Sequence, residues 1–258
     1  MIIVKDLYKN YGKNEVLKGL SIEIQKGETL VILGRSGVGK SVLLKHLMGI
    51  EKPDQGTINI DGIEITSTPK SKLFPHIKHM GMLFQGSALF DSMTVEENVG
   101  FYLSQHKNPK TNKPYTKKEM HEKVLEALSM FGLEGSEKKM PSDLSGGMKK
   151  RAGIARLLIY RPDILLYDEP TTGLDPITAE QINALIIKTQ KELKGTSIIV
   201  THDLHSALYV GDRLALHEDG KILYVEKPEK FLEINHPTIT FMRNTIKNTL
   251  PGRNHVRN

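Results

Sequence analysis

The stretch TLVILGRSGVGKS, residues 29–41, joins a β-rich apolar run to a glycine-rich turn. The turn matches the pattern G-x-x-x-x-G-K-[ST], and apolar residues recur at helical spacing in the segment that follows, KSVLLKHLMG. A strand, a small-residue loop and a helix in this order let backbone N–H groups converge on phosphate oxygens at the helix N-terminus. These residues therefore predict an α/β fold built around a phosphate-binding loop.

The predicted loop carries two side chains with separate roles. Lys40 would place a positive charge on the β- and γ-phosphates of a bound triphosphate, and the Ser41 hydroxyl would ligate Mg²⁺. Small residues around them let the backbone come close to the phosphates. The predicted phosphate-binding residues are Gly34, Arg35, Ser36, Gly37, Val38, Gly39, Lys40 and Ser41.

The composition is that of a folded chain without cysteine. At 258 residues, with 38% hydrophobic and 26% charged side chains, the chain is neither disordered nor collagen-like. No apolar stretch reaches the ~18 residues of a membrane-spanning helix, and the first residues lack the apolar core of a secretory signal. The absence of cysteine excludes disulfides and thiolate metal sites. We expect a cytoplasmic protein.

The charge balance is basic. Thirty-six Lys and Arg against 30 Asp and Glu give a formal net charge of +6. This surplus suits anionic partners such as nucleotides, nucleic acid or lipid headgroups. Charge alone does not choose among them.

Short β-rich runs and turn signals outline the remaining strands. MIIV, SIEI, ILLY and SIIV read as strands, and the last two are continuously apolar, as in strands covered on both faces. The Asp-Gly pair inside INIDGIEI predicts a hairpin, and RLALHEDGKILYVE reads as another. Between ILLY and SIIV, Asp175 and Pro176 predict the start of a helix that Gly195 closes.

The middle third is helical in pattern. Thr94 with Glu97, and Thr116 with Glu119, have the spacing of capping boxes, which predicts two helix starts. Residues 106–118 between them are rich in Lys, Asn and Pro, so we expect an exposed loop.

Two carboxylates follow the apolar run ILLY. Asp168 and Glu169 would stand at the carboxyl end of a central strand, where α/β sheets bind ligands. Asp168 suits the Mg²⁺-holding acid of a phosphate-loop NTPase, and Glu169 would orient or deprotonate an attacking water.

A second anion site is predicted at LSGGM. Ser145 and the unhindered backbone amides of Gly146 and Gly147 precede the helix-like segment KKRAGIARLLI, so they stand at a helix start. A chain with two separate anion sites suggests that each serves a different half of a composite site.

With these motifs in this order, the chain resembles ATP-binding cassette (ABC) ATPases over residues 1 to about 230. The resemblance implies that Ser145, Gly146 and Gly147 of one copy close over ATP held by the other copy's loop. It also implies an ABC-type α/β fold with a mixed β core, an antiparallel β subdomain and an inserted helical subdomain. ATP and Mg²⁺ are the cofactors it implies.

Four further residues match the family's motifs. Tyr11 matches the aromatic that stacks on adenine, and Asp175 the segment that crosses the dimer interface. Gln85 matches the glutamine that senses Mg²⁺ and water, and His202 the histidine that contacts the γ-phosphate. The resemblance thus implies catalytic roles for Glu169, His202, Gln85 and Lys40, and metal roles for Ser41, Gln85 and Asp168.

The sequences of the motifs resemble those of one subgroup of ABC ATPases. GKSVLLKHLMG, LFQGSALFDSMTVEENV and PSDLSGGMKKR resemble the ATPases of lipid-trafficking systems that work with MCE-domain proteins. Met148, where the family usually has glutamine, is a match within that subgroup. The resemblance implies a homodimer beneath two permease subunits at the inner membrane, moving phospholipid or similar cargo with an MCE-type partner. A cassette for another solute and a nucleic-acid-associated cassette are the alternatives; we expect no nucleic-acid partner.

An apolar cluster follows Met82. Leu83, Phe84, Ala88, Leu89, Phe90 and Met93 form either a groove for a short permease helix or part of a helical core. We expect Phe90 and Met93 to be exposed and near a docked permease.

The predicted domain is residues 1–235, with a helical subdomain at about 86–160. Residues 236–258 form a basic, partly disordered C-terminal extension. Its tail, from about Lys247, would contact a partner or anionic lipid or be an unstructured end.

Overall fold

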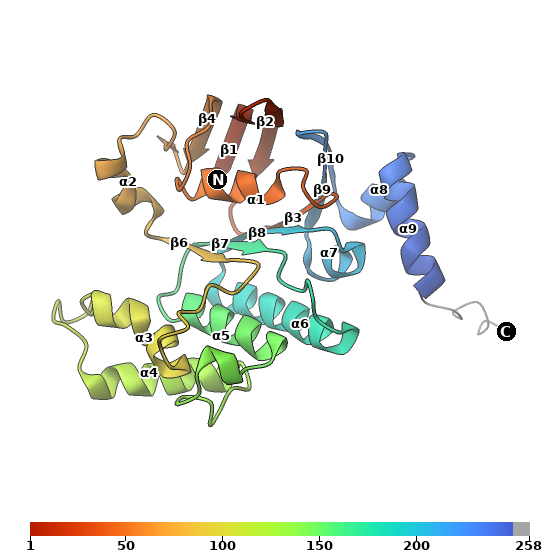
Figure 1. The fold of residues 1–258 in the computed structure, drawn as a ribbon. Helices are drawn as coiled ribbons and strands as arrows, with labels where there is room; N and C mark the ends of the chain where they lie inside the picture. The colour runs from red at the N-terminus through yellow and green to blue at the C-terminus, as the bar shows by residue number, and fades with distance from the viewer. Residues whose placement is uncertain (250–258) are drawn as a thin grey trace.

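The computed structural model describes residues 1–249, except for the side chains of Lys70 and residues 246–249. Two sheets form its frame (Figure 1). The four-stranded sheet is antiparallel, in the order β2 (Asn14–Ile24), β1 (Ile2–Tyr11), β4 (Gln55–Ile60) and β5 (Ile63–Glu64). The six-stranded sheet has the order β10 (Lys221–Glu226), β9 (Arg213–Glu218), β3 (Thr29–Leu33), β8 (Thr196–Thr201), β7 (Ile164–Asp168) and β6 (Met80–Leu83).

The larger sheet is mixed. Strands β9, β3, β8, β7 and β6 run parallel, and only the edge strand β10 is antiparallel. Every residue of β3, β7 and β8 is buried, because both faces of the sheet are covered. The predicted α/β class with a mixed core and an antiparallel part is therefore confirmed.

Two apolar cores lie on opposite faces of the six-stranded sheet. On β3, Val31 and Leu33 pack into one core while Leu30 and Ile32 pack into the other, because successive side chains alternate between the faces. One core packs against helices α3 (Val95–Gln105), α4 (Lys117–Met130), α5 (Gly146–Leu158), α6 (Pro176–Leu193) and α7 (Leu204–Val210). The other packs against α1 (Lys40–Leu47), α2 (Lys70–Ile77) and the antiparallel sheet (Figure 1).

Both predicted hairpins are present. Asp61 and Gly62 join β4 to β5 with φ of 49° and 88°, and Asp219 and Gly220 join β9 to β10 with φ of 48° and 73°. Two successive positive φ values are what a two-residue type I′ turn requires, and its twist matches that of the strands. The sequence signal therefore fixes local turn geometry.

The two predicted capping boxes also form. Thr94 Oγ1 accepts from the Glu97 N–H, and the Glu97 carboxylate accepts from the Thr94 N–H, at the start of α3. Thr116 and Glu119 make the same reciprocal pair at the start of α4. Helices α3 and α4 thus begin at the positions that the capping boxes predict.

Thr94→Ala is expected to lower the free energy of unfolding by about 1 kcal/mol, because the Glu97 N–H loses its acceptor. Chemical denaturation measures this. Thr94→Ser is the control, since it keeps the accepting oxygen. Equal losses for both variants would contradict the cap assignment.

The end of α6 corrects one expectation. The residue that ends the helix in the left-handed conformation is Lys194, with φ of 52°, and not Gly195. Gly195 is required for a different reason: a Cβ there would lie 2.7 Å from the carbonyl oxygen of Asp163. The glycine serves close packing between chain segments rather than helix termination.

The loop at residues 106–118 is largely exposed, as predicted, and helix α4 begins within it, at Lys117. An isolated antiparallel bridge pairs Lys107 with Pro114. The Asn108 N–H donates to the Lys113 carbonyl at 2.8 Å, so hydrogen bonds give the loop a defined turn.

The C-terminal part adds helices α8 (Pro228–Glu233) and α9 (Pro237–Thr249), which flank β10 and α7 (Figure 1). Phe231 and Ile239 are fully buried in the core beneath them. The predicted extension thus starts as a packed helix. Of the tail from about Lys247, for which we predict an unstructured end, the backbone as far as Thr249 belongs to α9, and residues 250–258 lie outside the described part.

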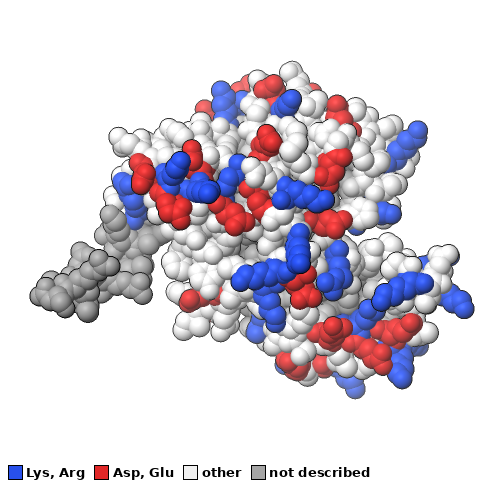
Figure 2. Space-filling model, turned by 180° about the vertical axis from the view of Figure 1, so that it is seen from behind, with Lys and Arg blue, Asp and Glu red and all other residues white. Residues whose placement is uncertain are grey.

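Charged side chains of both signs are interspersed on the face seen from behind in Figure 2. Lysines and arginines alternate there with acidic residues. Among the described residues, Lys9 pairs with Glu51 and Arg213 pairs with Glu28. The net charge of +6 is therefore not gathered into one continuous patch on that face.

Candidate nucleotide site

A cavity of about 370 Å³ lies where the glycine-rich loop leaves β3 and enters α1. The loops that follow β7 and β8 also reach it, so it occupies the carboxyl edge of the parallel strands. The lining residues are Tyr11, Val16, Ser36, Gly37, Gly39, Lys40, Ser41, Val42, Gln85, Glu169, Thr172 and His202.

The loop backbone needs glycine at two positions. Gly39 has φ of 103°, a conformation that L side chains rarely adopt, and precedes the first residue of α1. A Cβ on Gly34 would lie 2.5 Å from the carbonyl oxygen of His217, so β9 presses against the loop. The loop is therefore held open toward the cavity by backbone geometry.

Lys40 is held on the loop itself. Its Nζ donates to the carbonyl oxygens of Gly34 and Arg35 at 2.7 and 2.9 Å. It also lies 3.3 Å from Glu169 Oε1, and its side chain is only 5% exposed. A buried ammonium fixed in this way presents its charge at one defined point of the cavity.

Ser41 and Asp168 form an oxygen pair at the start of α1. Ser41 Oγ donates to Asp168 Oδ1 at 2.8 Å. Burial raises the pKa of Asp168, while this hydrogen bond and the charge of Lys40 act in the opposite direction.

This oxygen pair fits Mg²⁺. The ion takes oxygen ligands, and usually only one or two from protein side chains when phosphates and water supply the rest. Within residues 1–249, no group of three or more His, Cys, Asp or Glu gathers as a complete metal cage. The arrangement suits an ion shared with phosphate.

Glu169 lines the cavity and has a strained backbone conformation. Its φ is 48°, which is uncommon for a residue with a side chain and occurs at functional sites. Its Oε2 accepts from Thr172 Oγ1 at 2.8 Å and from His202 Nδ1 at 2.9 Å. With Lys40 at its other oxygen, the carboxylate is fixed from three sides, as a group that orients water must be.

Tyr11 lies at the rim of the cavity. Its hydroxyl donates to Glu51 Oε2 at 2.6 Å, and Lys9 Nζ is 5.3 Å from the ring centroid. Burial and the hydrogen bond to Glu51 raise the pKa of Tyr11 to about 12, so the phenol stays neutral at physiological pH. The ring is thereby held in place with 44% of the residue exposed.

The predicted second anion site lies apart from this cavity. Ser145 is the N-cap of α5, and its Oγ accepts from the Met148 N–H at 3.3 Å. Asp175 is the N-cap of α6, and hydrogen bonds from Thr178 lower its pKa. A Cβ on Gly147 would lie 2.5 Å from Thr178 Cγ2, so the two helix starts pack together.

The predicted residues therefore form two groups. Tyr11, Gln85, Glu169 and His202 lie around the glycine-rich loop, with Asp168 bonded to Ser41. Ser145, Gly146, Gly147 and Asp175 lie together at the starts of α5 and α6 and do not line the cavity. Gly34, Arg35 and Val38 of the loop do not line it either; Arg35 faces a neighbouring cavity beside α9.

Comparison with known proteins decides the family. The model of the ABC transporter family matches residues 17–172. The chain belongs to the ABC transporter family. A probable ribonucleotide transport ATP-binding protein, mkl, of Mycobacterium leprae is 40% identical over 238 residues, which cover 92% of this chain and 67% of that protein. Protein TRIGALACTOSYLDIACYLGLYCEROL 3 of Arabidopsis thaliana is 36% identical, with 93% and 72% covered. The chain thus spans about two thirds of these relatives' length.

Solved structures place it among the family's ATPase cassettes. The dimeric post-hydrolysis structure of the ATP-binding cassette MJ0796, bound to ADP and Pi, matches with a TM-score of 0.79 and 33% identity. That match covers 88% of this chain and 99% of the other. The predicted ABC fold is confirmed, and so is the prediction of an ATPase that takes ATP with Mg²⁺.

Cassettes of this family dimerise and work with membrane permeases. None of the helices in the described part of this cassette has the length and apolar composition needed to cross a bilayer.

Three residues at or beside the cavity were not identified by the sequence motifs. Thr172 donates to Glu169, and Val16 lines the cavity. Lys150 is buried and donates to the carbonyl oxygens of Gln85 and Glu169. The one available signal was the helical spacing of Lys150, which shares a face of α5 with the buried Gly147 and Ile154.

Proposed function

We propose that this cassette is the ATP-hydrolysing subunit of a membrane transporter and acts as a homodimer. The observation that carries the proposal is the separation of the two site groups within one chain. The Lys40 loop and Glu169 share a cavity that Ser145 does not line, and Ser145 stands at a separate helix start, that of α5. A second copy facing the first would bring the missing half to each cavity.

The proposed roles rest on the family resemblance, and the contacts within the cavity support them. The loop from Gly34 to Ser41 cradles the phosphates of ATP, with Lys40 on the β- and γ-phosphates and Tyr11 stacked on the adenine. Ser41, Asp168 and Gln85 would hold Mg²⁺, which would supply charge neutralisation at the phosphates of ATP.

Around the scissile bond, Glu169 orients and deprotonates the attacking water, and His202 donates to the γ-phosphate. Ser145, Gly146 and Gly147 of the partner close over the same nucleotide, with Asp175 at the interface. Since phosphoryl transfer depends on positioning and charge stabilisation, hydrolysis requires the closed dimer.

We propose phospholipid, or a similar lipid, as the cargo, moved between envelope membranes. The motif sequences support this proposal, because they resemble those of lipid-trafficking ATPases. The Arabidopsis relative, which is named after a glycolipid, also supports it. The dimer would sit at the cytoplasmic face of the inner membrane under two permease subunits, in a system with an MCE-type lipid-binding protein. The mycobacterial relative, described as a probable ribonucleotide transport protein, favours a soluble solute as the second candidate.

Reconstitution separates the two cargoes. The complex that co-purifies with this chain is placed in phospholipid vesicles, and ATP-dependent transfer of labelled phospholipid or uptake of labelled ribonucleotide is followed. Phospholipid transfer that stops in the absence of ATP is the expected result. Ribonucleotide uptake without lipid transfer would establish the alternative, and nucleic-acid-stimulated ATPase activity would refute the transport proposal.

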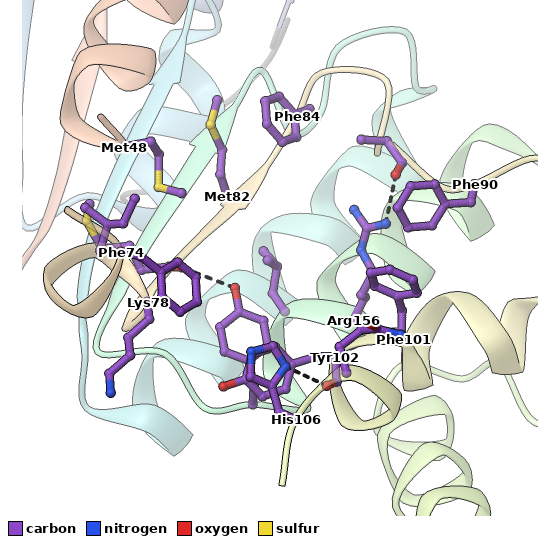
Figure 3. Close-up of a pocket in the computed structure, with 16 residues that line it drawn as sticks. Met48, Phe74, Lys78, Met82, Phe84, Phe90, Phe101, Tyr102, His106 and Arg156 are labelled. Atoms are coloured by element: carbon purple, nitrogen blue, oxygen red, sulfur yellow. Dashed lines mark hydrogen bonds between the residues drawn. The ribbon is translucent and has the colours of Figure 1, made fainter. Parts of the chain in front are cut away.

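The permease would dock in an apolar groove of about 490 Å³ between the six-stranded sheet and the helical part (Figure 3). Met48, Phe74, Met82, Phe84 and Phe101 line it together with Phe90, which is 43% exposed. The Phe90 and Phe101 rings are 5.0 Å apart, and the Arg156 guanidinium lies 5.8 Å from the Phe90 ring. A short amphipathic helix fits such a surface.

The expected exposure of Met93 is wrong, because this side chain is half-buried and lines a neighbouring cavity instead. Leu83 is also buried, in the core above α5. The apolar cluster therefore has two parts. Phe90 lines the groove, and Leu83 belongs to the hydrophobic core.

Phe90→Asp is expected to reduce permease binding at least about tenfold, since a charge would be buried in an apolar interface. Pull-down with the permease measures binding. The ATPase rate of the isolated cassette serves as the folding control and should be retained. Tyr209→Asp is the matched variant, because Tyr209 is equally exposed, at 43%, and does not line the groove. Equal losses in both variants would refute docking in the groove.

A further inference from the structure

Helix α5 holds the loop that contains Gln85 through two cationic side chains. Lys150 Nζ donates to the carbonyl oxygen of Gln85 and, at 3.2 Å, to that of Glu169. One and a half turns further along, Arg156 donates to the carbonyl oxygens of Ala88 and Ser87 at 2.8 and 3.3 Å. Helix α5, whose N-cap is Ser145, is thus hydrogen-bonded to the segments that follow β6 and β7 and carry Gln85 and Glu169.

The segments that accept hydrogen bonds from α5 have strained backbone conformations. Ser87 and Ala88 have φ of 64° and 46°, and Glu169 has φ of 48°. Residues with side chains adopt this left-handed region at an energetic cost, and it persists only where surrounding contacts enforce it. The hydrogen bonds from α5 to the carbonyls of Ser87, Ala88 and Glu169 are contacts of that kind.

Lys150 is a charged residue at a buried position of α5. Its side chain is on the buried face of α5 and is 5% exposed, where a packing residue would be expected. Among the described residues its ammonium forms no salt bridge, and backbone carbonyls are its partners. Burial lowers the pKa of Lys150, and the charges of Asp168 and Glu169 act against this shift. A buried charge is costly, so its retention points to a function beyond packing.

We infer that Lys150 is a positioning residue that ties the Ser145 helix to Gln85 and Glu169 of the same protomer. When the partner's nucleotide engages Ser145, α5 moves as a rigid helix, and Lys150 transmits this movement to the backbone that aims Gln85 and Glu169. Contact between one protomer's Ser145 and its partner's nucleotide thereby affects how Gln85 and Glu169 are positioned in the first protomer's own cavity. The inference rests on the proposed roles of these three residues.

The test is Lys150→Met, which keeps the length of the side chain and removes the donor. We expect kcat for ATP to fall at least about tenfold while KM changes less than about threefold, because the phosphate cradle is untouched. Lys150→Arg restores donors and should recover most of the loss. Lys123→Met is the control, since Lys123 is exposed on α4 in the same helical part.

The experiment distinguishes failure of the Lys150 inference from failure of the proposed nucleotide site. Unchanged kcat in Lys150→Met, or no recovery in Lys150→Arg, overturns the inference, as does a parallel loss of kcat and ATP binding. If thermal melting reveals that Lys150→Met does not fold, Lys150→Gln takes its place with the same expectation. Glu169→Gln is assayed alongside: if it is inactive and Lys150→Met is normal, only this inference fails, whereas normal turnover in Glu169→Gln overturns the assigned site itself.

Discussion

Glutamine in place of Glu169 is expected to reduce ATP turnover at least about a hundredfold, the range that a positioned general base contributes. The substitution keeps the size of the side chain, but it removes the basicity and replaces one of the two accepting oxygens with an NH₂ donor. The partners that hold Glu169, which are Thr172, His202 and Lys40, remain in place. ATP should therefore still bind, and the closed dimer should accumulate because hydrolysis no longer opens it.

Phosphate release and size-exclusion chromatography with and without ATP measure the two effects together. Glu126→Gln is the matched control, since Glu126 is exposed on α4 and is remote from the cavity. Normal hydrolysis by Glu169→Gln would show that another group activates the water. Loss of both hydrolysis and dimerisation would point to damage of the ATP cradle instead.

Ser145→Arg is expected to have an effect of similar size by a different route. Ser145 is exposed at the start of α5 and does not line the cavity of its own chain. A long cation there would clash with a nucleotide presented by the partner and remove the cap of α5. We expect turnover to fall about a hundredfold or more, as when an oxyanion-stabilising donor is removed.

The variant distinguishes the two halves of the site. ATP binding to the isolated Ser145→Arg chain should be retained, because the Lys40 loop is intact, and a fluorescent ATP analogue measures it. Lys40→Met is the comparison and should lose binding as well as turnover. If Ser145→Arg also fails to bind nucleotide as a single chain, Ser145 serves the site of its own protomer.

Features governed by neighbouring residues were predictable from sequence. The glycine-rich loop, the capping boxes at Thr94 and Thr116 and the Asp-Gly turns each depend on a few successive residues, and each formed as expected. The end of α6 was not predicted correctly. The backbone adopts the left-handed conformation at Lys194, and Gly195 packs closely against the Asp163 carbonyl instead.

Features governed by distant segments were not predictable. Lys150 is 65 residues from Gln85 in sequence, and no motif links an isolated lysine of a helix to a carbonyl oxygen that far away. Met93 follows the same rule: the apolar pattern identified it as part of a cluster, but its burial depends on where α3 and α4 pack. Tertiary packing decides such cases, and sequence periodicity reports only that a side chain is apolar.

Dimers of defined composition test most directly whether two protomers complete each other's site. Protomers with different affinity tags are co-expressed, and mixed dimers are purified through both tags. In one dimer, Lys40→Met and Ser145→Arg are on the same protomer and the partner is wild type. In the other, each protomer carries one of the two substitutions.

If each nucleotide lies between one copy's loop and the other copy's α5, the dimer with both substitutions on one protomer has no intact site and is inactive. The dimer with one substitution on each protomer keeps one intact site and hydrolyses ATP. The reverse pattern, with activity only when one protomer is wild type, would contradict the composite site.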